Sequence, residues 1–113
     1  MTLPLAEARV LNGVVYIAGQ VGLDDASGDV PDDFRDEVRL VLRNCEAALQ
    51  SAGASLTNVV QVRVYITEAE LFTTMNEIYS EFFAEPFPVR TTLVTGLPLP
   101  TLRIEIDMLA GVS

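Results

Sequence analysis

The run from Val59 to Thr67 constrains the fold most strongly, because its apolar and polar residues alternate one by one. A period of two is the pattern of a β-strand with one buried face. The apolar face would consist of Val60, Val62, Val64 and Ile66, and the opposite face of Gln61, Arg63, Tyr65 and Thr67. The chain is therefore expected to form a sheet that packs one side against a hydrophobic core.

Two segments with helical spacing of apolar residues can cover that side. The first begins near Phe34, where Asp32 or Asp33 can cap it, and ends at Gly53. Its apolar stripe consists of Phe34, Val38, Val41, Leu42, Cys45, Leu49 and Ala52. The second follows the capping-box pattern Thr67-x-x-Glu70. Its stripe consists of Leu71, Met75, Ile78, Tyr79, Phe82 and Phe83.

Further short apolar runs predict the remaining strands. Residues 8–11 and 14–18 flank Asn12-Gly13, a strong hairpin signal because both turn residues tolerate positive φ. Gly19 is expected to break the second of these strands at a bulge or turn. The last two runs cover residues 89–95 and 102–110. The order β-β-α-β-α-β-β predicts an α+β fold, a single sheet with two helices on one face, in one domain over residues 1–113.

The second face of this sheet would mix apolar groups with Arg63, Tyr65, Glu105 and Asp107, and with Arg90 or its neighbours. An uncovered face of that kind would be a sizeable exposed patch. We therefore expect the chain to form a closed homo-oligomer that buries it.

The charge of the chain restricts its partners. A net charge of −9 with no histidine argues against nucleic acid and against anionic membrane surfaces. We expect no metal and no cofactor, since histidine is absent and Cys45 is the only cysteine. Cys45 falls on an apolar stripe and is expected to be a buried thiol, compatible with a reducing, cytoplasmic location. Residues 1–7 have no basic leader pattern, and no stretch has the apolar length of a membrane helix.

Arg90 and Glu105 are the strongest candidates for a functional site. Arg90 follows Phe87-Pro88 at the head of a β-branched run, and Glu105 lies in the middle of the last alternating run. If these two runs pair as strands, a cation and a carboxylate can face one cavity. An ordinary structural ion pair is the competing interpretation.

With these residues in place, the chain resembles the RidA (formerly YjgF) family of reactive intermediate deaminases. The matching segments occur in the family's order along nearly the whole chain: VYIAGQVG at 15–22, LRNCEAAL at 42–49, AGASL at 52–56, VVQVRVYIT at 59–67, NEIY at 76–79, PVRT at 88–91, LP at 97–98 and IEI at 104–106. The resemblance implies a chorismate-mutase-like fold. It also implies a homotrimer whose sheets form a central barrel, with ligand clefts between subunits.

The resemblance further implies a role for each candidate residue. Arg90 would bind the carboxylate of a small anionic imine, and Glu105 would act on the water that attacks the imine carbon, releasing ammonia and a 2-keto acid or other carbonyl product. A guanidinium fits a carboxylate bidentately, and a carboxylate can deprotonate water. Gly19 and Asn76 match positions that line or brace the cleft. Ala18 and Thr92 occupy positions where the family often has serine and cysteine.

The chain also departs from the family pattern. Pro4-Leu5-Ala6 replaces a Pro-Tyr-Ser segment whose tyrosine helps form the pocket, and the segment between Phe83 and Phe87 is short. A non-catalytic binder of small carboxylates is therefore the alternative function. The negative charge and the absence of histidine argue against a ribonuclease. Chorismate mutase activity is disfavoured because the seven Lys/Arg residues show no cluster.

Overall fold

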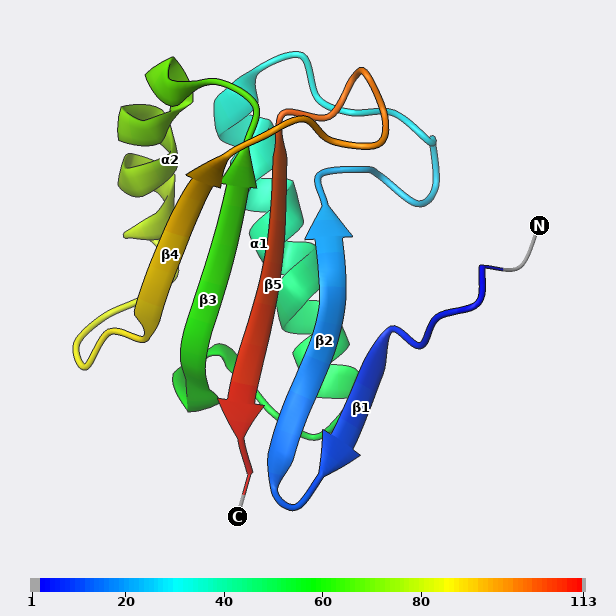
Figure 1. The fold of residues 1–113 in the computed structure, drawn as a ribbon, viewed down its shortest axis with the longest axis vertical. Helices are drawn as coiled ribbons and strands as arrows, with labels where there is room; N and C mark the ends of the chain where they lie inside the picture. The colour runs from blue at the N-terminus through cyan, green and yellow to red at the C-terminus, as the bar shows by residue number, and fades with distance from the viewer. Residues whose placement is uncertain (1–2, 113) are drawn as a thin grey trace.

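The computed structural model describes residues 3–112 and shows a single mixed sheet with both helices behind one face (Figure 1). The elements are β1 (Ala8–Leu11), β2 (Val14–Val21), α1 (Phe34–Ser51), β3 (Val59–Ile66), α2 (Phe72–Tyr79), β4 (Val89–Val94) and β5 (Ile104–Gly111). Short 3-10 turns at Leu56–Asn58 and Ala69–Leu71 precede β3 and α2. The expected order and layering are confirmed. Met1 and Thr2, on which part of the leader-peptide expectation falls, lie outside the described residues.

The strand order in the sheet is β1-β2-β5-β3-β4. β5 lies between β2 and β3 and is antiparallel to both, whereas β4 pairs with the outer edge of β3 in parallel. A parallel neighbour needs a crossover connection, and α2 forms part of it. As a result, β4 and β5 do not pair with each other.

The core lies between the sheet and the helices. β5 shows strict alternation, with Ile104, Ile106, Met108 and Ala110 buried on the helix side. The apolar stripe of α1 packs against this side, and Asp33 caps the helix by accepting a hydrogen bond from the Arg35 backbone N–H at 2.9 Å. The left-handed φ of Gly53, +85°, lies just beyond the helix end, as expected. Within the described chain no helix has both the length and the apolar composition to cross a membrane.

Two bulges shift the strands from the simple alternation. Val60 is 56% exposed rather than buried, because the register between β3 and β5 shifts between Val59 and Gln61 and moves Val59 to the core. β2 does not end at Gly19 but continues to Val21, past a register shift between Ile17 and Gln20. The hairpin at Asn12-Gly13 is as expected, with φ values of +51° and +76°.

The start of the second helix was predicted wrongly. The capping box at Thr67 and Glu70 does not form; a 3-10 turn occupies Ala69–Leu71, and α2 begins at Phe72 without a side-chain cap. The helix ends at Tyr79, although Phe83 is still buried in the core. The last strand is also shifted and runs over Ile104–Gly111 rather than 102–110.

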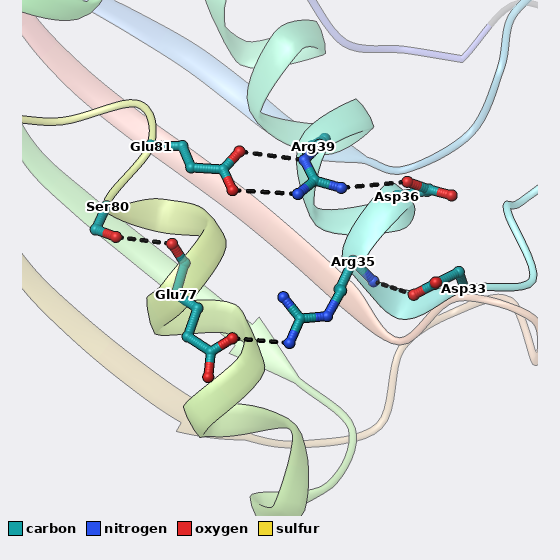
Figure 2. Close-up of polar contacts among 7 residues, drawn as sticks. All are labelled: Asp33, Arg35, Asp36, Arg39, Glu77, Ser80 and Glu81. Carbon is teal, nitrogen blue, oxygen red and sulfur yellow. Dashed lines mark hydrogen bonds and ion pairs between the residues drawn. The ribbon is translucent and has the colours of Figure 1, made fainter.

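Ion pairs join the outer surface of α1 to α2 and to the turn that follows α2 (Figure 2). Arg35 contacts Glu77 at 2.8 Å, and Arg39 donates to both carboxylate oxygens of Glu81 at 3.1 Å. Exposed pairs of this kind contribute about 0–1 kcal/mol each. They join α1 to α2 and to the turn after it on the side away from the sheet.

The open face of the sheet carries no helix (Figure 1). Arg63 pairs with Asp107 at 2.8 Å, and the Tyr65 hydroxyl donates to the same carboxylate at 3.2 Å. Val89 and Leu93 are 68% and 52% exposed. This face therefore has the mixed apolar and charged character that the sequence predicted.

Candidate functional site

Arg90 lies on the edge strand β4 and points to the helix side of the sheet. It is in register with Val62, a core residue of β3. Its Nη2 donates to Asn76 Oδ1 at 2.7 Å, and its guanidinium carbon lies 4.7 Å from the ring centroid of Tyr79 and 5.8 Å from that of Phe72. Asn76, a polar residue in the middle of α2, therefore has a structural role, because it anchors this arginine.

An open hollow of about 400 Å³ adjoins the guanidinium. It is lined by Asn76, Tyr79, Phe87, Pro88 and Arg90. Within residues 3–112, no carboxylate forms an ion pair with Arg90. The remaining N–H donors of the guanidinium are therefore available to an anionic ligand.

Glu105 lies on β5 and faces the opposite, open side of the sheet. It is half-buried, in register with Val21 of β2 and Tyr65 of β3. Desolvation raises the pKa of its carboxyl group, and the negative charge of Asp107 raises it further. A carboxyl group whose pKa lies above its usual range is a better proton acceptor for water near neutral pH.

Gly19 makes room for the Glu105 side chain. A Cβ built on Gly19 would overlap Oε2 of Glu105, so only glycine allows the carboxylate to rest against β2. Ala18, directly before it, is partly buried, and its backbone N–H donates to the Glu7 carbonyl at 2.8 Å. Ala18, Gly19 and Glu105 therefore form one group on β2 and β5.

Thr92 belongs with Arg90. It follows two residues later on β4, so its side chain projects to the same side of the sheet, and it is partly buried. The candidate residues fall into two groups: Asn76, Arg90 and Thr92 on α2 and β4, and Ala18, Gly19 and Glu105 on β2 and β5.

The expectation that Arg90 and Glu105 share one cavity through paired strands is wrong for a single chain. β3 separates β4 from β5, and the two side chains project from opposite faces of the sheet. The reason is the α2 crossover, which places β4 on the outer edge of β3 rather than beside β5. The same geometry removes the interpretation of the two residues as an ion pair within the chain.

The sequence did not lead us to predict two aromatic residues of the site. Phe72 was not singled out, and Tyr79 was assigned only to the apolar stripe of the second helix. With Asn76 they have the spacing i, i+4, i+7, which places all three on one face of α2. An asparagine between two aromatics at this spacing was the available signal. The part of the chain that the structure describes holds no group of three potential metal-ligating side chains.

Comparisons with known proteins identify relatives of this chain and of its fold. The family model described as Endoribonuclease L-PSP matches residues 2–112. A RutC family protein of Pyrococcus horikoshii is 39% identical over 109 residues, which cover 95% of this chain and 86% of that protein. The human 2-iminobutanoate/2-iminopropanoate deaminase is 37% identical over 109 residues, covering 95% of this chain and 79% of the human protein.

Solved structures have the same fold. The crystal structure of Escherichia coli TdcF with bound serine matches with a TM-score of 0.91 at 32% identity, covering all of this chain (100%) and 91% of that one. RidA from an Antarctic Psychrobacter matches with a TM-score of 0.92 at 27% identity, covering 99% and 91%. The full-length match to the family model, the relatives above 30% identity and the shared fold together establish that this chain belongs to the RidA (YjgF) family.

Proposed function

We propose that this protein hydrolyses small 2-imino acids and their enamine tautomers to 2-keto acids and ammonia. The observation that carries the proposal is the guanidinium of Arg90, which Asn76 holds at 2.7 Å beside an open hollow with no carboxylate paired to it. Family membership supplies the reaction class, since a relative at 37% identity is named for the deamination of 2-iminobutanoate and 2-iminopropanoate.

In the proposed mechanism, Arg90 binds the substrate carboxylate through two parallel N–H···O bonds. Glu105 orients a water molecule and accepts its proton as the water oxygen attacks the carbon of the C=N bond. The resulting carbinolamine receives a proton on nitrogen, the C–N bond breaks, and ammonia leaves. One imino acid and one water thus give one 2-keto acid and one ammonia, without any cofactor or metal.

The two halves of this site must come from different subunits. Arg90 and Glu105 project from opposite faces of one sheet, so one chain cannot present both to a small ligand. The open face carries exposed apolar side chains such as Val89 and Leu93 on β4, and also Glu105 and Asp107 on β5. Covering this face with a second copy removes that area from water. We infer a homotrimer in which Arg90, Asn76 and Thr92 of one subunit meet Ala18, Gly19 and Glu105 of the next.

The test is turnover of imines generated in the assay by an amino-acid oxidase, followed through the appearance of the 2-keto acid. Arg90→Ala should raise KM by about 10- to 100-fold, because charge-assisted hydrogen bonds to the carboxylate contribute about 1.5–3 kcal/mol. Glu105→Gln should lower kcat by about 10²- to 10⁴-fold, the usual contribution of a general base. Arg43→Ala, at an exposed arginine of α1, is the matched control and should change neither.

Failure of the wild-type protein to accelerate hydrolysis of any imine in the panel would refute the enzymatic proposal. Full activity in Arg90→Ala would refute its site. Binding of 2-keto acids that depends on Arg90 without any turnover would instead identify a carboxylate-binding protein.

A further inference from the structure

One face of α2 carries three side chains that meet Arg90. Phe72, Asn76 and Tyr79 lie four and then three positions apart, so they line up along the helix. Asn76 accepts a hydrogen bond from Nη2, and the guanidinium carbon lies 4.7 Å from the Tyr79 centroid and 5.8 Å from that of Phe72. The site arginine is therefore held by a hydrogen bond at one end and by aromatic rings beside it.

The Tyr79 ring is a fixed surface. Tyr79 is only 7% exposed, and its ring stacks on Phe83 with centroids 4.7 Å apart and an interplanar angle of 29°. Buried side chains in a close-packed core keep one rotamer. A guanidinium over such a ring is attracted by its electron-rich face.

The hydroxyl group of Tyr79 takes no part in holding Arg90. It is buried and has no hydrogen-bond partner among the described residues. Because the oxygen atom is covered, a ligand in the hollow contacts the ring and not the hydroxyl. Burial also raises the pKa of this phenol against the opposing effect of Arg90, so the group remains neutral at physiological pH.

We propose that the ring of Tyr79, assisted by Phe72, is a positioning surface that fixes the plane of the Arg90 guanidinium. The guanidinium carbon lies over the ring, Asn76 occupies one N–H, and the remaining donors would form the edge offered to the ligand. That arrangement selects planar monocarboxylates that bind edge-on. The inference rests on the proposed binding role of Arg90, and it adds to it the residues that orient the arginine.

The experiment compares Tyr79→Phe with Tyr79→Leu in the full-length protein. Calorimetry with pyruvate and 2-oxobutanoate measures affinity, and the imine assay measures KM and kcat. Tyr79→Phe keeps the ring and should bind both acids within about twofold of wild type. Tyr79→Leu should weaken binding and raise KM by about 5- to 30-fold, with kcat nearly unchanged, since desolvated cation–π contacts contribute about 1–2 kcal/mol.

Two further variants separate orientation from general effects. Arg90→Lys keeps the charge but loses the planar fork, and it should bind as weakly as Arg90→Ala. Phe34→Leu removes a buried aromatic ring of α1 that lies against Arg103 rather than Arg90, and it should lower the melting temperature while leaving the affinity of folded protein near wild type.

The outcomes distinguish this inference from the proposed function. Wild-type affinity in Tyr79→Leu, or equal loss in Tyr79→Phe and Tyr79→Leu, overturns the role of the ring while Arg90-dependent turnover stands. Absence of turnover with ring-dependent carboxylate binding overturns the deaminase activity alone. No binding of either acid by the wild-type protein overturns both.

Discussion

Removal of the Glu37 carboxylate should destabilise the protein more than any surface change. Glu37 is completely buried (0% exposed) on α1, and it is the only charged side chain so placed among residues 3–112. Its two oxygens accept from the Arg103 backbone N–H at 2.8 Å and from Arg103 Nε at 2.7 Å. Arg103 Nη2 in turn donates to the carbonyl groups of Pro31 and Asp32 at 2.9 and 3.0 Å.

The size of the effect follows from this geometry. Breaking a buried ion pair by removing one partner costs about 3–5 kcal/mol, because the other charge is left without compensation. The Arg103 side chain is 34% exposed, so water can replace part of the lost contact. We therefore expect about 3 kcal/mol for Glu37→Ala, at the lower end of that range. This is a large part of a typical stability of about 5–15 kcal/mol.

Urea unfolding at one fixed protein concentration measures this loss, because dissociation of an oligomer makes stability depend on concentration. The double variant Glu37→Leu with Arg103→Met removes both charges at similar volume, and it should recover a substantial part of the loss. A change below about 1 kcal/mol in Glu37→Ala, or an equal loss in the double variant, would refute the assignment of a compensated buried charge.

Three further predictions concern the site and its supports. Gly19→Ala should lower kcat at least about tenfold, because the new methyl group displaces the Glu105 carboxylate. The free energy of unfolding should change by only about 1 kcal/mol, since the clash is with the end of a flexible side chain. A wild-type kcat would show that Glu105 need not rest against β2. Glu105 acts in its deprotonated form, and its pKa is raised mainly by desolvation and further by Asp107. The pKa that describes the acid limb of the kcat/KM profile should therefore lie above the pKa of an ordinary glutamate. Asp107→Asn should move the acid limb to lower pH, and an unmoved limb would contradict the role of Asp107. The raised pKa of Glu105 also adds stability to the folded protein, which is present at low pH and is lost as the pH rises through that pKa. Glu81→Ala removes an exposed ion pair and should cost at most about 1 kcal/mol without changing KM, whereas a raised KM would show that these pairs hold α2 at the site.

Periodicity was enough to predict the helices, the strands and the layer they form. The alternation in β5 and the stripe of α1 identify most of the residues that these two elements bury in the core, although the stripe omitted Glu37 and Ala48. A period states which residues share a face of one element. It does not state which strand is the neighbour, and for that reason the side-by-side placement of Arg90 and Glu105 was wrong.

The other misses have local causes. The bulge that exposes Val60 depends on the register of β5, which is far away in the sequence. The burial of Glu37 was not predicted, because a charged residue beside an apolar stripe is normally solvated and because its partner Arg103 is distant along the chain. The anchoring of Arg90 by Asn76 was within reach of the sequence, since asparagine is a poor choice in the middle of a helix.

The central claim is that each site combines Arg90 of one subunit with Glu105 of another, and mixed oligomers test it most directly. At substrate concentrations well below the wild-type KM, Arg90→Ala and Glu105→Ala subunits are each expected to lose most of the activity when alone. After the two are unfolded, mixed in equal amounts and refolded together, about one quarter of the interfaces in a ring should pair an intact Arg90 with an intact Glu105. The account predicts recovery of about that fraction of wild-type imine hydrolysis. A mixture as inactive as its parents, with mass measurement showing that the subunits have exchanged, would contradict it.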